Sequence, residues 1–349
     1  MIKKAYFGTT KDGGEISKYT LTNSKGMSVD IINFGAIITS IKTPDRTGKL
    51  GDVVLAYQSA DDYFEGNPYY LGAVIGRYGN RIAHAEFELD SKTYKLEKNN
   101  GCHNLHSGKG GFHNKIWHAE IIDSEIPILR MSYVSPDGEG GFPGNLEVCV
   151  IYNLKENNEL EICYQATTDQ VTVLNMTQHT YFNLSGNVSS SILNHELKLN
   201  AEQFIPTDET NIPFGHFENV ANTPFDFKIS KTIGKDITAM DEQIKVGFGY
   251  DHTFVIPGEG LRAFAEVYDS VSGRILEVKT TEPGVQFYTG NHLDGSKFNQ
   301  EGNPIASRTG FCLETQKFPD SPNQRQFPTS ILKPGELYES KTVLKFSVK

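Results

Sequence analysis

Two segments of the sequence hold side chains that could move protons on a small polar substrate. The first, NMTQHTYFNLSG at residues 175–186, places His179 among amide and aromatic side chains. Amides exchange hydrogen bonds with hydroxyl groups and aromatic rings cover the apolar face of a pyranose, so this composition suits a sugar pocket. An imidazole, with an ordinary pKa of about 6.5, can donate and regain a proton at neutral pH. The segment therefore indicates either a catalytic histidine or a structural one.

The second segment, TGFCLETQKFPD at residues 309–320, carries Glu314 in an apolar run. If Leu313 and Thr315 face one side of a strand, Glu314 shares the other side with Cys312 and Gln316. A poorly solvated carboxyl group has a raised pKa and is a better base. The alternative is an edge-strand glutamate that faces water. Asp251 in GYDHTF poses the same question, with His252 pointing to the opposite face.

Four histidines lie close together between residues 103 and 118, at His103, His106, His113 and His118. The HNLH spacing offers two possible zinc ligands, but residues i and i+3 of a strand face opposite sides. The cluster is therefore either a set of exposed loop histidines or one pocket histidine with neighbours. Arg77 and Arg81 in GRYGNRI could bind carboxylates or sugar hydroxyls, or could be solvated.

Other reaction classes have no matching motif in this chain. The glycine-rich stretches fit neither a dinucleotide fingerprint nor a phosphate-binding loop, and no GxSxG segment offers a serine nucleophile. The four cysteines, Cys102, Cys149, Cys163 and Cys312, form no CxxC pair, which argues against a zinc knuckle or a disulfide scaffold. We expect reduced thiols, with a bond between Cys149 and Cys163 left open.

The overall charge and hydropathy restrict the partners of the protein. The 349 residues carry a formal charge of −10 without long blocks of like charge, so we expect no binding to nucleic acid or to anionic lipid. No apolar run approaches the length of a membrane span, and the start MIKKAYFGTT lacks the apolar core of a signal peptide. We therefore predict a cytoplasmic protein with no membrane partner.

The elements that must position these residues are mostly strands. Apolar residues alternate along residues 129–133, 146–154 and 160–166, and KENN between the last two segments predicts a tight hairpin. AFAEVYD and RILEVKT flank a second hairpin, with Gly273 as the residue of positive φ. Short helices are expected only near residues 59–70 and 236–245. Neither a linker nor an internal repeat divides the chain. The prediction is an all-β fold, a large antiparallel sandwich forming a single domain over residues 1–349.

Several motifs taken together resemble the aldose 1-epimerase, or galactose mutarotase, family. They occur in family order and are GRYGNRIA, NLHSGKGGF, SPDGEGGFPGNL, TQHTYFNLSG, GYDHTF, PGVQFYTGNHLDG and FCLETQKFPDSPN. The resemblance covers nearly the whole chain. It implies one large β-sandwich with an open cleft that uses neither a metal nor an organic cofactor.

The resemblance also assigns roles by motif match. It implies that Glu314 is the general base and that His179 is the general acid. Substrate-binding roles fall on Asn80, Arg81, His106, Asp251 and Gln286. Most members of the family have a neutral residue where His103 stands, so no role is assigned to it. The four-histidine cluster would then hold one pocket residue, His106, and three bystanders.

The implied activity is the interconversion of the α- and β-anomers of free aldohexoses such as D-galactose and D-glucose. One acid and one base suffice for it, because the ring opens to an aldehyde and closes on the other face. Three alternatives stay open: a glycosidase that uses Asp251 and Glu314, a carbohydrate-binding module, and a hexose-6-phosphate 1-epimerase. The sequence does not decide which of galactose, glucose, xylose and maltose is the preferred substrate. It also does not distinguish a monomer from a homodimer.

Overall fold

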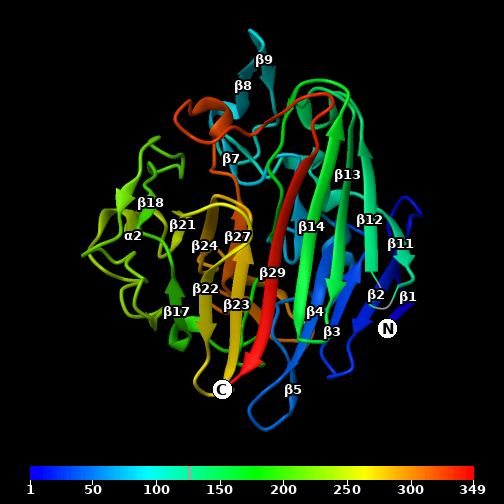
Figure 1. Ribbon diagram of the computed structural model, residues 1–349, viewed down its shortest axis with the longest axis vertical. Coiled ribbons are helices and arrows are strands. Elements are labelled where there is room, and N and C mark those ends of the chain that lie inside the picture. Colours follow the sequence, from blue (N-terminus) through cyan, green and yellow to red (C-terminus); the bar gives the residue numbers. More distant parts are fainter. Residues whose placement is uncertain (125, 127) are drawn as a thin grey trace.

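Antiparallel strands form almost all of the regular structure (Figure 1). The computed structural model describes residues 1–124, 126 and 128–349. Its two α-helices are short, α1 (Ala60–Phe64) and α2 (Glu242–Val246), and both lie where the sequence predicts them. Ser59 and Asp241 cap their N-termini through side-chain oxygens. The prediction of an all-β fold with few short helices is confirmed.

The largest sheet has nine strands and runs through the middle of the molecule. Its order is β11 (His118–Ile122), β12 (Ile128–Ser135), β13 (Leu146–Leu154), β14 (Glu159–Thr168), β29 (Tyr338–Val348), β23 (Arg274–Thr280), β22 (Arg262–Tyr268), β17 (Glu196–Leu199) and β20 (Lys231–Thr232). The C-terminal strand β29 thus lies between strands from the middle of the chain, coloured red between green and yellow in Figure 1.

Two five-stranded sheets accompany it. The first comprises β1 (Ile2–Thr9), β2 (Glu15–Thr22), β3 (Ser28–Ile32), β4 (Ile37–Pro44) and β5 (Leu50–Asp52). The second has the order β19 (Glu218–Asn219), β18 (Gln203–Ile205), β21 (Asp251–Val255), β24 (Gly284–Tyr288) and β27 (Cys312–Gln316). This second sheet carries Asp251, Gln286 and Glu314.

Short two-stranded ladders connect these layers. They pair β6 (Ala73–Ile75) with β16 (Thr177–His179), β7 (Arg81–Ile82) with β10 (Asn104–Leu105), β8 (Glu86–Leu89) with β9 (Lys92–Lys95), β15 (Thr172–Val173) with β28 (Ile331–Leu332), and β25 (Asp294–Phe298) with β26 (Pro304–Ala306). Single turns of 3-10 helix lie at Ala83–Ala85, Gly108–Gly110, Phe112–Asn114, Glu139–Gly141, Ile192–Asn194 and Ser321–Asn323.

Both predicted hairpins are confirmed. Strands β13 and β14 pair with Leu154 opposite Leu160, and Asn158 in the turn has φ 63°. Strands β22 and β23 pair antiparallel and are joined by a turn in which Gly273 has φ 77°. The left-handed conformation is accessible to glycine and asparagine at little cost, so these residues set where each hairpin turns.

One buried apolar cluster joins the three large sheets. It takes Ile31 from β3, Ile162 from β14, Val285 from β24 and Leu313 from β27, all at most 5 % exposed. Inward residues alternate with outward ones along these strands, as the sequence indicates. Burial of this apolar surface is the main stabilising term of the fold.

All four cysteines are free thiols. Cys149 lies opposite Gln165 and Cys163 opposite Ile151, so the two cysteines are diagonal neighbours on adjacent strands, without a bond. Among the described residues, no helix has both the length and the apolar character that crossing a membrane requires.

Arg77 is buried, although the sequence left a solvated or sugar-binding arginine open. It is 1 % exposed, and its guanidinium donates to the hydroxyl and the carbonyl oxygen of Ser135 and to the carbonyl oxygens of Pro136 and Pro143. The side chain therefore ties the segment before Asn80 to the end of β12. Its role is structural.

We expect Arg77→Met to lower the free energy of unfolding by about 3 kcal/mol, because several buried acceptors lose a charged donor. Arg130→Met is the matched control. Its Nη1 lies 3.8 Å from Glu120 Oε2 in a pair that is 42 % and 55 % exposed. Such an exposed pair contributes less than about 1 kcal/mol. Urea unfolding measures both, and equal effects of the two substitutions would contradict the structural role of Arg77.

Candidate active site

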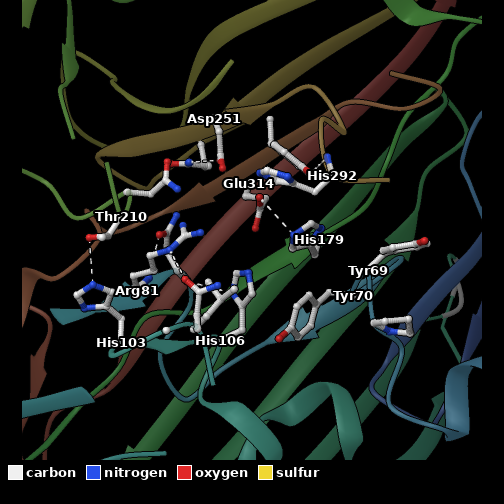
Figure 2. A pocket seen from close by; sticks show the side chains of 18 of the residues that line it. Tyr69, Tyr70, Arg81, His103, His106, His179, Thr210, Asp251, His292 and Glu314 are labelled. Carbon is white, nitrogen blue, oxygen red and sulfur yellow. Dashed lines mark hydrogen bonds and ion pairs between the residues drawn. The ribbon is translucent and has the colours of Figure 1, made fainter. Parts of the chain in front are cut away.

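The candidate residues line one open cavity of about 530 Å³ (Figure 2). One wall is the sheet of β21, β24 and β27, and β16 lies beside β27. The opposite wall comes from the loops around residues 68–70, 80–81 and 100–106, and residues 209–211 reach the rim. Segments distant in sequence therefore meet at this cavity.

Glu314 lies on the sheet wall, where the strand register places it. Thr253 of β21 is opposite Gln286 of β24, which in turn is opposite Glu314 of β27. The three residues therefore form one row across the sheet and share a face. Glu314 is 3 % exposed, so the alternative of an edge-strand glutamate in water is wrong. As expected, Cys312 and Gln316 are buried on the same side of the strand.

His179 faces Glu314 from the end of β16. Its Nε2 lies 3.7 Å from Glu314 Oε1, and its Nδ1 lies 3.6 Å from Cys312 Sγ. Tyr70 stacks on the imidazole with ring centroids 5.8 Å apart, and Tyr181 does so at 5.0 Å. The imidazole is thus held on several sides, with Nε2 directed at the carboxylate.

Asn80 and His106 hold each other at the loop wall. The N–H of Asn80 donates to His106 Nδ1 at 3.1 Å, and the N–H of His106 donates to the carbonyl oxygen of Asn80 at 3.0 Å. A neutral imidazole whose Nδ1 accepts a hydrogen bond carries its hydrogen on Nε2. His106 is therefore a fixed donor. Both residues, like Tyr70, have positive φ, 64° at Asn80, 54° at His106 and 56° at Tyr70. Such strained conformations cluster at functional sites.

Arg81 and Asp251 add opposite charges to the cavity. Arg81 Nε donates to Asn100 Oδ1 at 3.0 Å, and within the described part of the chain its two terminal nitrogens have no protein partner. Gln286 Nε2 donates to Asp251 Oδ1 at 2.7 Å, and Thr253 donates to the amide oxygen of Gln286 at 2.5 Å. Gln286 thus holds the Asp251 carboxylate in place. His252 points to the opposite face, as predicted, and packs on Phe225 with ring centroids 4.8 Å apart.

A sequence model of the aldose 1-epimerase family matches residues 17–345 of this chain. The chain belongs to the aldose 1-epimerase family. It is 43 % identical to the galactose mutarotase of Bos taurus over 99 % of both chains, and 38 % identical to the aldose 1-epimerase of Escherichia coli K12 over 96 % of both. Among solved structures, galactose 1-epimerase from Lactobacillus acidophilus superposes with a TM-score of 0.88 at 27 % identity, covering 100 % of this chain and 99 % of that one.

All seven residues that resemblance to the aldose 1-epimerase family points to lie around this single cavity. They are Asn80, Arg81, His106, His179, Asp251, Gln286 and Glu314. The loop and sheet walls contribute them from six separate segments, so only the fold brings them together.

Sequence reasoning missed other residues of the cavity. His103, expected to be a bystander, is 5 % exposed and lines the cavity, where its Nε2 lies 3.0 Å from Thr210 Oγ1. His113 is buried against Tyr70, with ring centroids 4.8 Å apart, and of the four clustered histidines only His118 is exposed. Tyr70 also lines the cavity, and the sequence did not single it out as a site residue. The direction in which a side chain of a loop points depends on the backbone angles, and the alternation of polar and apolar residues in the sequence does not reveal these angles.

Two groups of side chains lie close enough to bind a metal, His106 with His179 and Glu314, and His84 with Cys102 and His103. The fixed tautomers argue against both. His106 Nδ1 accepts the N–H of Asn80, and His103 Nδ1 accepts the N–H of His84 at 3.0 Å. Nε2 therefore carries the hydrogen in each ring and has no free lone pair for a cation. Binding a metal would require these backbone hydrogen bonds to break.

Burial shifts the pKa values of the central pair in opposite directions. It raises the pKa of Glu314 well above its ordinary value, Asp251 raises it further, and Arg81 opposes the shift. Burial also lowers the pKa of His179 to about 4. Between these two values the pair holds one proton in total, and Nε2 of His179 and Oε1 of Glu314 are close enough to exchange it.

We therefore expect a bell-shaped pH profile of kcat/KM. Its acid limb marks the addition of a second proton to the pair, and its alkaline limb marks the loss of the last one. Asp251→Asn removes a negative charge, lowers the pKa of Glu314 and should move the alkaline limb to lower pH. Arg81→Met should move it to higher pH. Rates measured across pH test both, and movement of the alkaline limb in the same direction in the two variants would refute this assignment.

Cys312 should determine which nitrogen of His179 carries the hydrogen. Burial raises the pKa of this thiol well above its ordinary value, so it remains S–H and can donate to Nδ1. We expect Cys312→Ala to lower kcat about tenfold with little change in KM, and Cys312→Ser to restore most of the loss, because a hydroxyl replaces the donor. If the alanine and serine variants are equally impaired, the thiol acts by packing alone.

Proposed function

We propose that this protein interconverts the α- and β-anomers of free aldohexoses such as D-galactose and D-glucose. The observation that carries the proposal is the buried pair of Glu314 Oε1 and His179 Nε2, 3.7 Å apart in a cavity lined with hydroxyl-binding groups. One base and one acid at this spacing can reach the two oxygens bonded to C1 of a pyranose. No other group is needed for the reaction.

In the ring-opening direction, the Glu314 carboxylate takes the proton of the C1 hydroxyl. The bond between C1 and O5 breaks, and O5 receives the proton from Nε2 of protonated His179. The product is the open-chain aldehyde with a hydroxyl at C5, and the pair is then neutral. Burial favours this neutral form, since desolvation disfavours both charges.

Ring closure reverses these roles. Rotation about the C1–C2 bond presents the other face of the aldehyde. The C5 hydroxyl attacks C1 while His179 takes its proton, and Glu314 returns a proton to the new C1 hydroxyl. Each positioned proton transfer contributes roughly 10²- to 10⁴-fold. The pair ends as it began, so no co-reactant is consumed and neither a metal nor an organic cofactor takes part.

The remaining residues would bind the sugar hydroxyls. We assign this role to the terminal nitrogens of Arg81, the Nε2–H of His106 and the free oxygen of Asp251, with Asn80 and Gln286 holding His106 and Asp251 in place. Arg81 is the only Arg or Lys side chain among the described residues that line the cavity, whereas Glu209, Asp251 and Glu314 are acidic. This balance favours a neutral sugar over a hexose 6-phosphate, whose phosphate needs several cations.

We expect Glu314→Gln to abolish anomer exchange while leaving sugar binding within a few-fold, because the amide keeps the shape of the carboxylate but cannot accept the proton. Polarimetry of freshly dissolved α-D-galactose and α-D-glucose measures the rate, and calorimetric titration measures binding. Glu282→Gln is the matched control. Glu282 is also buried, at 4 % exposure, but accepts a hydrogen bond from Tyr338 away from the cavity.

Equal loss of binding and rate in a folded Glu314→Gln variant would refute Glu314 as the base. The same samples distinguish the rival functions. Release of new reducing ends from a disaccharide would indicate a glycosidase, and binding without acceleration by the wild type would indicate a carbohydrate-binding module. The single domain over residues 1–349, the cytoplasmic location and the monomeric or homodimeric state stay predictions.

A further inference from the structure

The two ends of the cavity differ in chemistry on either side of the catalytic pair. Arg81 and Asp251 lie at the end on the Glu314 side (Figure 2). Beyond His179 the lining is aromatic. Tyr69 lies on the far side of His179 from Arg81 (Figure 2). His292 stacks on Tyr288 with ring centroids 6.3 Å apart and planes at 24°, and Tyr288, the cross-strand neighbour of Asp251, lies between the two ends. Pro68 and Leu293, the chain neighbours of Tyr69 and His292, also line the cavity.

The proposed function, on which this inference rests, fixes how the sugar lies between the two ends. Glu314 marks the C1 hydroxyl and His179 marks the ring oxygen O5. C2 is bonded to C1 and C5 is bonded to O5, so C2 and C3 lie toward Arg81 and Asp251. C5, with the C6 group attached to it, lies on the His179 side, and a substituent on C6 therefore points to the aromatic end.

We propose that the aromatic end, walled by Pro68, Tyr69, His292 and Leu293, is a second sugar subsite. Its occupant is a neutral pyranose linked to C6 of the reducing aldose, so the enzyme acts on 1→6-linked disaccharides as well as on free hexoses. The reducing unit occupies the catalytic subsite, and the second unit stacks on the aromatic wall.

The wall has the properties that a stacking subsite requires. Tyr69 is held by its hydroxyl, which donates to Asp294 and lies 3.1 Å from Ser296 Oγ, so strand β25 fixes the orientation of its ring. Aromatic faces bind the apolar face of a pyranose, and a fixed ring loses little entropy on binding. His292 is exposed, which leaves the outer edge of the subsite open for a second unit.

Charge at this end argues against a phosphate on C6. Hydrogen bonds from Ser296 and Tyr69 lower the pKa of Asp294 to about 2, so this carboxylate is negative at neutral pH. Lys297, the nearby cation on the same strand, is already bound to Asp62 at 2.6 Å. Among the described residues that line this end there is no Arg or Lys side chain, so a dianionic group would meet a negative charge, whereas a neutral sugar would not be repelled.

The test compares anomerisation rates of glucose, isomaltose, melibiose and glucose 6-phosphate in the wild type, Tyr69→Ala and His292→Ala. We expect kcat/KM for isomaltose and melibiose within about tenfold of glucose, and glucose 6-phosphate below both. Tyr69→Ala should lower kcat/KM for the two disaccharides about tenfold, which is a loss of about 1.4 kcal/mol from one stacked ring, and should leave glucose within twofold. His292→Ala should act in the same direction.

Tyr6→Ala is the matched control, because Tyr6 is a 67 % exposed tyrosine on β1, outside the cavity. His292→Ala keeps the proposal testable if Tyr69→Ala does not fold. The hydrogen bond from His292 to Tyr288 comes from the backbone N–H, which alanine retains. If glucose is not epimerised, the proposed function itself fails. If glucose reacts but the disaccharides do not, or if both variants impair glucose and disaccharides equally, the second subsite is refuted. A faster reaction of glucose 6-phosphate than of isomaltose would also refute it.

Discussion

The structure depends on keeping a carboxyl group and an imidazole together in a place that water hardly reaches. Glu314 and His179 are each at most 5 % exposed, and neither forms a strong ion pair with a fixed opposite charge. An isolated buried charge is costly, so desolvation drives the pair toward its neutral, one-proton form. That cost is what brings the two pKa values into a range where one proton can belong to either group.

Strand register supplies the precision that this pair requires. Thr253, Gln286 and Glu314 form one row across three strands, and a slip of one residue would turn Glu314 toward the apolar core. The loop wall uses a different device, because Asn80 and His106 bind each other through backbone groups. Sheet and loop thus fix opposite sides of the same cavity.

The sequence predicted those features of the protein that are encoded by residues close together in the chain. Alternation and turn residues located both hairpins, and the motifs named seven residues that meet at one cavity. It did not predict that Arg77 is buried, because the partners of its guanidinium come from residues 135–143. His103 was missed for a similar reason, since its partner Thr210 is distant in sequence.

A thiol beside His179 suits a reaction in which the acid and base exchange roles. A carboxylate at that position would stabilise the imidazolium and raise the pKa of His179, which would hinder proton donation to the ring oxygen. Cys312 carries no charge, because its burial keeps the thiol protonated. Its sulfur can donate S–H to Nδ1 of the neutral ring and accept N–H from the protonated one, so it supports both states across 3.6 Å without favouring either strongly. The uncharged partner thus preserves the balance that burial creates between Glu314 and His179.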